Sequence, residues 1–151
     1  MHPTSILVLL GLALPATAAP VPDITARAAA GGTNVNGSIY AFGSPAACRQ
    51  AFYNSGACGL SARRKNVDPK ISLIALPSAI FDKAASSAQA GSLCGRVITM
   101  KRNGVKRKAM VADRNQGPDN SIDMCLDLWQ AFGGRDRDGT LLRGFSWEVS
   151  Q

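Results

Sequence analysis

The feature that most constrains the fold of this 151-residue chain is a set of four cysteines: Cys48, Cys58, Cys94 and Cys125. They follow an N-terminal segment typical of a secretory signal, in which an apolar run over residues 6–14 precedes a proline and small residues that fit cleavage near Ala18. An even number of cysteines in a small exported chain predicts two disulfides. Three pairings are open, and we favour Cys58–Cys94 with Cys48–Cys125. A zinc site built from all four is the weaker alternative, because no two of them have the close spacing of zinc ligands.

The sequence divides into three parts. Residues 1–18 are the predicted signal peptide, residues 19–36 are expected to form a flexible or processed leader, and residues 37–151 are expected to form one domain. Asn36 begins an Asn-Gly-Ser triplet, an N-glycosylation acceptor that a eukaryotic secretory pathway could use, and its occupancy stays open. We therefore expect a secreted, extracellular monomer.

Short strands separated by turns dominate the predicted domain. Strands are expected at residues 38–42, 70–76 and 144–149, and helices at 78–90 and 124–132. Asn103-Gly104 separates two further β-prone runs, 95–102 and 105–113. Because both turn residues accept a positive φ, this pattern predicts a hairpin with a type I′ turn.

The predicted hairpin has one apolar face and one basic face. A two-residue turn places Lys101 opposite Lys106 and Thr99 opposite Lys108, and like charges in such positions cost stability. The lysines either protect an edge strand against aggregation or form a basic surface for an anionic polymer. Alternation continued to Asp113 places its carboxylate on the apolar face, where it needs a partner or a function.

The net charge of +7 comes from 17 Lys and Arg against 10 Asp and Glu. A second basic cluster consists of Arg63, Arg64 and Lys65. This balance favours an anionic partner, and an acidic polysaccharide such as pectin fits an exported protein best. We expect no nucleic acid and no membrane as partner, because no aromatic residues are interleaved with the charges.

Histidine chemistry is excluded from the predicted mature chain, since the only histidine is His2. A Ser/His/Asp triad, a Cys/His pair and a histidine-based metal site are therefore ruled out. We expect neither a metal nor a cofactor.

A series of short motifs points to a known family. In chain order they are Gly37-Ser38-Ile39-Tyr40, Gly56-Ala57-Cys58-Gly59, Leu93-Cys94-Gly95-Arg96, Val111-Ala112-Asp113-Arg114, Ile122-Asp123-Met124 and Phe145-Ser146-Trp147-Glu148-Val149. Their order resembles the small secreted double-psi β-barrel proteins: the rare-lipoprotein-A-like domain, the first domain of expansins and the fungal loosenin-like proteins. The resemblance implies a mainly β fold, namely a six-stranded double-psi β-barrel with short helices, stabilised by disulfides.

The resemblance also implies a ligand-binding groove at Asp113 and Asp123, with Tyr40 next to it. In the hydrolytic and lytic members an acid at the position of Asp123 protonates the glycosidic oxygen, and inverting hydrolysis needs a second carboxylate to activate water. The residues after Tyr40, where endoglucanase members have that base, are Ala41 and Phe42. This departure resembles expansins and loosenins, which are thought to loosen polysaccharide packing without net hydrolysis. We expect a protein that is not an enzyme.

Each of these residues has a purely structural alternative. Asp113 could be a buried carboxylate paired with Arg114 or with a backbone amide, Asp123 could cap a helix that begins at Met124, and Tyr40 could belong to the core.

Two functions follow from the resemblance. The first is non-hydrolytic binding of extracellular or cell-wall polysaccharide. The alternative is a protein inhibitor of papain-like cysteine proteases, or a secreted effector acting on a host protein, for which two disulfides and the loop 115–120 could provide a rigid binding element.

Overall fold

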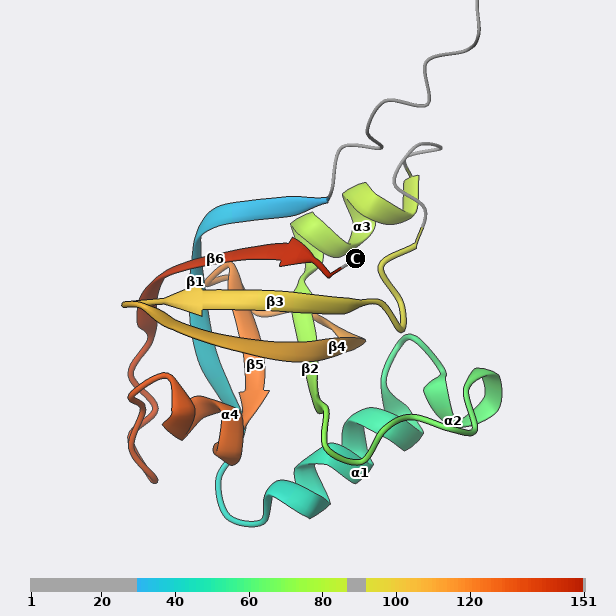
Figure 1. The fold of residues 1–151 in the computed structure, drawn as a ribbon, viewed down its shortest axis with the longest axis horizontal. Coiled ribbons are helices and arrows are strands. Elements are labelled where there is room, and N and C mark those ends of the chain that lie inside the picture. Colours follow the sequence, from blue (N-terminus) through green and yellow to red (C-terminus); the bar gives the residue numbers. More distant parts are fainter. Residues whose placement is uncertain (1–29, 87–91, 151) are drawn as a thin grey trace, which may run out of the picture.

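The computed structural model describes residues 30–86 and 92–150, in which six strands close into a barrel (Figure 1). In chain order the strands are β1 (Gly31–Ala41), β2 (Ser72–Pro77), β3 (Val97–Arg102), β4 (Val105–Asn115), β5 (Ser121–Cys125) and β6 (Leu142–Val149). Around the barrel they follow the order β1-β5-β2-β4-β3-β6. The pairs β1/β5 and β2/β4 are parallel and the other four are antiparallel.

The β3–β4 hairpin has the predicted turn and register. Asn103 and Gly104 both have positive φ, 46° and 79°. Lys101 lies opposite Lys106, and Thr99 opposite Lys108. However, β3 pairs with β6 on its other side, and the barrel is closed. The interpretation of the lysines as protection of an edge strand is therefore wrong, because β3 and β4 have no free edge.

In the described part of the chain, four helices lie outside the barrel: α1 (Pro45–Ser55), α2 (Leu60–Arg63), α3 (Ser78–Ser86) and α4 (Leu126–Ala131). The first two were not expected from the sequence, although Ser44 caps α1 by accepting a hydrogen bond from the backbone N–H of Ala47 at 3.3 Å. The helix α3 begins where predicted, and part of its predicted C-terminal end, residues 87–90, lies outside the described residues.

The barrel interior is filled by side chains that alternate along the strands. Ile98 and Met100 of β3, Met124 of β5 and Phe145 of β6 are all 0% exposed. Gly37 of β1 faces this core, and a Cβ there would lie 2.5 Å from the Phe145 ring and 2.6 Å from the Met124 methyl group. The barrel can therefore close around these large side chains only with a glycine at this position.

The barrel begins earlier than the sequence suggests. β1 starts at Gly31, so residues 31–36, which composition assigns to a flexible leader, belong to the strand. These residues form a strand despite their low hydrophobicity because they pair with β6: Gly31 lies opposite Glu148, and Gly32 lies opposite Trp147. The predicted signal peptide and residues 19–29 lie outside the described residues. Within residues 30–86 and 92–150, no helix is long and apolar enough to cross a bilayer.

Two disulfides join the helical segments to the barrel, in the pairing favoured from the sequence. Cys48 of α1 is bonded to Cys125 at the end of β5, and Cys58 is bonded to Cys94 before β3. All four cysteines form disulfides, so the alternative of a zinc site is wrong.

Candidate functional site

The two predicted site acids lie on the strands that flank β2. Asp113 of β4 and Asp123 of β5 are both in register with Ala75 of β2, and Ser38 of β1 is in register with Asp123. Paired residues on neighbouring strands share a face, so these four residues form one cross-strand row, the acid row, on the outer face of the barrel. Two strand spacings, about 10 Å, separate the backbones of the two acids.

A β-bulge brings Asp113 to this face. The pairing of β2 with β4 shifts between Ile74, opposite Val111, and Ala75, opposite Asp113, which leaves Ala112 as an extra residue. A one-residue shift moves the following side chain to the other side of the sheet. The expectation that Asp113 lies on the apolar face is therefore wrong.

Asp113 is held by backbone amides. Its Oδ1 accepts hydrogen bonds from the N–H of Ala57 at 2.7 Å and of Arg114 at 2.8 Å. The Arg114 guanidinium contacts Asp82 of α3 instead, at 2.8 and 2.6 Å. Of the structural alternatives for Asp113, the backbone amide is confirmed and the pairing with the Arg114 side chain is wrong. This carboxylate fixes the segment after α1 against β4.

Asp123 does not cap a helix, because it belongs to β5 and α4 begins only at Leu126, after Cys125 as the N-cap. Its Oδ1 contacts the Ser38 hydroxyl. The Ser38 Oγ lies 2.6 Å from the Ser121 Oγ, which lies 2.7 Å from the Asp119 Oδ1. Two carboxyl groups are thus joined through two hydroxyls, and we call this series Asp123–Ser38–Ser121–Asp119 the carboxyl chain.

The carboxyl chain has more oxygen–oxygen contacts than hydroxyl hydrogens to bridge them. Three oxygen–oxygen contacts need three hydrogens, whereas Ser38 and Ser121 supply one each. The Ser121 Oγ also accepts from the Asn115 Nδ2 at 3.1 Å, so this contact brings the chain no further hydrogen for its three oxygen–oxygen contacts, because the amide hydrogen stays on Asn115. Ser38 therefore shares one hydrogen between Asp123 and Ser121, unless a carboxyl group supplies the third hydrogen. When the Asp123 carboxyl is protonated, it can donate to Ser38, while Ser38 donates to Ser121 and Ser121 donates to Asp119.

The surroundings of Asp123 favour this protonated form. Desolvation by burial raises the pKa of Asp123, hydrogen bonding from Ser38 lowers this pKa, and the charges of Asp119 and Asp113 raise it further. The net direction is upward because desolvation, the largest cause, and the two neighbouring carboxylates together outweigh the hydrogen bond. Asp123 is therefore suited to present a neutral carboxylic acid, which can donate a hydrogen bond as well as accept one.

Tyr40 is exposed next to the acid row. It lies two residues after Ser38 on β1, about 7 Å along the strand. The register with β5 shifts between Ile39 and Ala41, so Tyr40 occupies a bulge. Its side chain is 48% exposed, and its ring lies 4.5 Å from the Phe52 ring of α1. The interpretation of Tyr40 as a core residue is therefore wrong.

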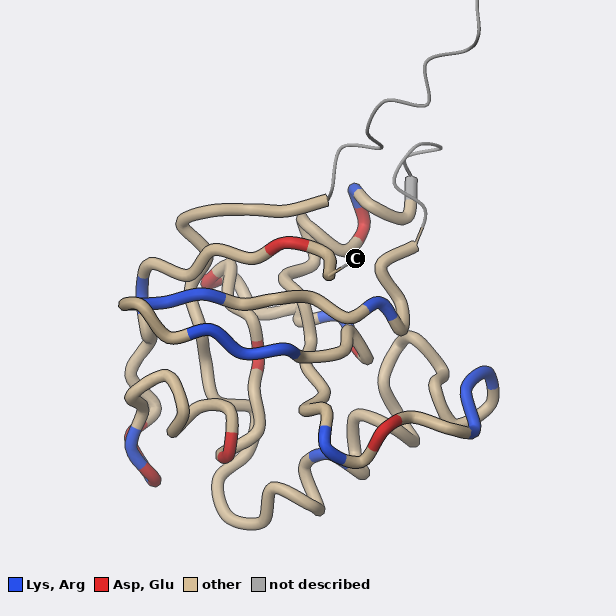
Figure 2. The backbone as a smooth tube through the Cα atoms, viewed as in Figure 1, with Lys and Arg blue, Asp and Glu red and all other residues tan. Residues whose placement is uncertain are grey.

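The predicted basic residues do not form one surface. Lys101, Lys106 and Lys108 lie on the β3–β4 hairpin, while Arg63, Arg64 and Lys65 lie at the end of α2 and after it, on a separate part of the molecule (Figure 2). Asn36 lies within β1, and its Nδ2, the atom that would carry a glycan, donates to the Asp119 carbonyl at 2.7 Å.

Sequence reasoning missed Ser38, Ser121, Asp119 and Asn115 as parts of the site. Asp119, Ser121 and Asp123 alternate with other residues, as side chains on one face of a strand do. That signal was hidden because Ser121–Cys125 was not recognised as a strand. Among the described residues, no group of three His, Cys, Asp or Glu side chains could hold a metal ion.

Comparison with known proteins identifies the fold. An expansin from Clavibacter michiganensis, solved as a mutant in complex with cellohexaose, matches with a TM-score of 0.53 and 17% identity over 79% of this chain and 50% of that chain. The apo form of that expansin gives a TM-score of 0.51. A Streptomyces papain inhibitor matches with a TM-score of 0.48 and 20% identity over 80% of this chain and 94% of that chain. No protein-family model matches, and neither does any curated protein.

The strand order and the expansin match define a double-psi β-barrel, as the sequence motifs predict. Its solved structural neighbours include the Clavibacter expansin, of which this chain spans about half the length. At 17% identity this likeness concerns the fold alone.

Proposed function

We propose that this protein is secreted and binds extracellular or cell-wall polysaccharide without hydrolysing it, at the surface formed by Tyr40, Ser38 and Asp123. The observation that carries the proposal is the exposed Tyr40 ring on β1, two residues after Ser38 of the carboxyl chain. An aromatic ring offers a flat apolar surface to a sugar ring, and nearby hydroxyl and carboxyl groups bind sugar hydroxyls. The two disulfides support the extracellular location.

The absence of hydrolysis is supported by the groups around Asp123. Asp113, the other acid of the row, uses one carboxylate oxygen to hold two backbone amides. Ala41 and Phe42, which follow Tyr40, have no carboxylate. Asp123 can thus donate a proton or a hydrogen bond, but a free general base is lacking at the position where endoglucanase relatives have theirs.

Retention on cellulose and chitin, two polymers without carboxylates, at low salt tests this proposal. We expect the full chain to be retained on at least one polymer, Tyr40→Ala to bind about tenfold more weakly, and Tyr40→Phe to bind normally, because stacking needs the ring and not the hydroxyl. Phe81→Ala is the matched control, since it removes a partly buried ring from α3. No retention, equal retention of Tyr40→Ala, or release of new reducing ends would contradict the proposal.

The loop between β4 and β5 favours a second candidate function. This function is inhibition of a papain-like cysteine protease or binding of another host protein. Asn115 holds this loop through Oδ1, which accepts from Gly117 N at 2.8 Å, and through Nδ2, which donates to Ser121 O at 2.9 Å. A braced loop loses little entropy on binding. Papain activity with stoichiometric protein tests this candidate, and unchanged activity at micromolar excess rules out papain inhibition.

A further inference from the structure

The strand order places β3 across the barrel from β5. In the closed order β1-β5-β2-β4-β3-β6, three steps separate these two strands in either direction. β5 with its neighbours β1 and β2 carries most of the acid row, whereas β3 lies between β4 and β6 (Figure 1). The outer face of β4, β3 and β6 therefore points away from Asp123.

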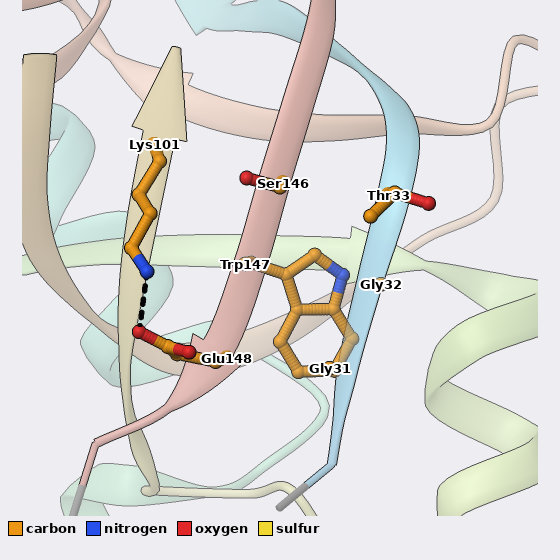
Figure 3. A pocket seen from close by; sticks show the side chains of 7 residues that line it. All are labelled: Gly31, Gly32, Thr33, Lys101, Ser146, Trp147 and Glu148. Atoms are coloured by element: carbon orange, nitrogen blue, oxygen red, sulfur yellow. Dashed lines mark hydrogen bonds and ion pairs between the residues drawn. The ribbon is translucent and has the colours of Figure 1, made fainter. Parts of the chain in front are cut away.

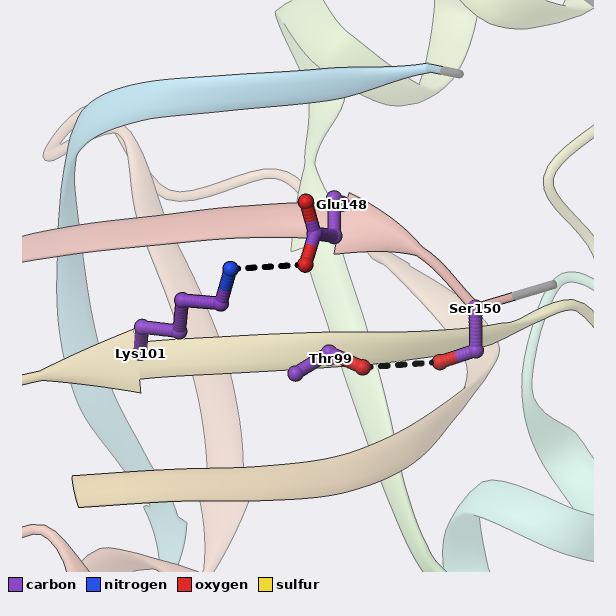
Figure 4. Close-up of polar contacts among 4 residues, drawn as sticks. All are labelled: Thr99, Lys101, Glu148 and Ser150. Atoms are coloured by element: carbon purple, nitrogen blue, oxygen red, sulfur yellow. Dashed lines mark hydrogen bonds and ion pairs between the residues drawn. The ribbon is translucent and has the colours of Figure 1, made fainter.

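That outer face carries two cross-strand rows of polar side chains. One row pairs Ser146 of β6 with Lys101 and Lys106, and the other pairs Glu148 of β6 with Thr99 and Lys108. We call these six residues the lysine face. The Thr99 Oγ1 also lies 2.9 Å from the Ser150 Oγ (Figure 4). The lysine face thus combines three ammonium groups, two hydroxyl groups and one carboxylate over three adjacent strands.

Positive charge exceeds negative charge on this face. Its single acid, Glu148, contacts Lys101 at 2.7 Å, and the hydrogen bond from Lys101 lowers the pKa of Glu148 (Figure 4). Among the described residues, Lys106 and Lys108 take part in no ion pair. Two lysines directly opposite each other, Lys101 and Lys106, repel, and the closed barrel removes edge protection as a reason for this cost.

A cavity of about 480 Å³ lies beside the lysine face, between β1, β6 and β3 (Figure 3). The polar side chains that line it are Thr33, Lys101, Ser146 and Glu148. Its volume is typical of a small-ligand site. Ammonium, carboxylate and hydroxyl groups at its rim are able to bind the hydroxyl and carboxylate groups of a sugar acid.

From this arrangement we propose a second binding surface, the lysine face with its adjoining cavity, which binds an acidic polysaccharide whose sugar units carry carboxylates. The large exposed apolar side chains of the described residues are Tyr40 and Phe42, at the end of β1. The six residues of the lysine face include no ring on which nucleic-acid bases could stack and no large apolar group to insert into a bilayer, and Trp147, which lines the adjoining cavity, is only 5% exposed. This surface is separate from the one proposed for Tyr40, so one barrel can hold two polymer chains.

Binding of the full chain to polygalacturonate over a range of salt concentrations tests the proposal. Fully methyl-esterified polygalacturonate is the matched ligand, because it has the same sugar chain without the charges. We expect the charged polymer to bind with a steep salt dependence and the ester to bind only weakly. Lys106→Gln with Lys108→Gln should weaken binding about fivefold per lysine at low salt, thus about 25-fold together.

Two further variants sharpen the test. Arg63→Gln with Lys65→Gln removes the same charge from the α2 region and should change binding much less. Glu148→Gln releases Lys101 from its ion pair and removes the only acid of the face, so binding of polygalacturonate should become several-fold tighter. Tyr40→Ala should leave this binding unchanged, which separates the lysine face from the polysaccharide surface proposed above.

Several results would overturn the proposal. Equal binding of the charged polymer and its ester would remove the role of charge, and an equal loss in the Arg63/Lys65 control would remove the role of this face. Tighter binding to duplex DNA or to phosphatidylserine vesicles, weakened by Lys106→Gln with Lys108→Gln, would assign the lysine face to another class of ligand.

Discussion

Replacing Asp123 by Asn should stabilise the protein at neutral pH and remove one component of its pH dependence. In the carboxyl chain, two hydroxyl hydrogens serve three oxygen–oxygen contacts, so full hydrogen bonding needs a protonated carboxyl. The Asn amide supplies the missing hydrogen at every pH. A hydrogen bond contributes about 1 kcal/mol net to stability. Asp123→Asn should therefore be more stable than the wild type by about this amount at every pH at which the wild-type carboxyl chain is ionised and lacks its third hydrogen.

The sign of the pH dependence follows from the raised pKa of Asp123. Below the ordinary pKa of an unfolded Asp, about 3.9, Asp123 is protonated in both the folded and the unfolded protein, and the carboxyl chain contributes fully to stability. As the pH rises through the raised pKa of the folded state, the native protein holds more protons than the unfolded chain, so this contribution is lost. The stability of Asp123→Asn minus that of the wild type should therefore increase from acid to neutral pH.

Urea denaturation between pH 3 and 8 measures this difference, and a gain of about 1 kcal/mol corresponds to a midpoint shift of about 0.5–1 M urea. Asp136→Asn, an exposed acid outside the carboxyl chain, is the matched control and should give a pH-independent difference. Asp119→Asn should stabilise like Asp123→Asn, since its amide supplies the hydrogen from the other end. The double variant should gain nothing more. A pH-independent difference for Asp123→Asn, or fully additive gains, would refute the counting of hydrogens.

Three structural predictions concern the elements that shape the site. Replacing Cys58 and Cys94 by serine should lower the free energy of unfolding by about 3–4 kcal/mol, because their disulfide closes a loop with a sequence separation of 36. Chemical denaturation measures this loss. Asp113→Ala should cost about 2 kcal/mol, because two backbone N–H groups lose their acceptor, and hydrogen exchange should increase at Ala57. Gly32→Ala should cost about 1–3 kcal/mol in thermal unfolding, because its Cβ would lie 2.7 Å from the Trp147 Nε1.

Local signals were sufficient to predict the hairpin and the class of fold. Asn103-Gly104 determines both the turn and the register, and from that register the opposition of Lys101 and Lys106 follows directly. The order of the Gly, Cys and Asp motifs then pointed to the barrel. These features depend on residues close together in the chain or on a pattern that spans it.

The candidate site depended on contacts that no local signal contains. The extra residue Ala112 transfers Asp113 from the inner to the outer face, and such a bulge is defined only by the partner strand β2. The strand β5 is only five residues long, and the helix expected at residues 124–132 overlaps its last two residues, so its pairing with β1 was not predicted. The contact between Ser38 and Ser121 spans 83 positions in the sequence, so only the closed barrel brings their hydroxyls together.

The strand order itself explains how a small barrel can separate two kinds of chemistry. The strand β4 belongs to both regions: it carries Asp113 near its C-terminal end, where it pairs with β2, and Lys106 and Lys108 near its N-terminal end, where it pairs with β3. With Ala112 as the extra residue of the bulge, the lysines and Asp113 all face outward, but they lie toward opposite ends of this strand. The lysine charges are thereby kept away from Asp123, whose pKa is raised by desolvation and, to a smaller extent, by the neighbouring carboxylates of Asp119 and Asp113. A cation moved next to Asp123 would favour its ionised form, and the carboxyl chain would lose its third hydrogen.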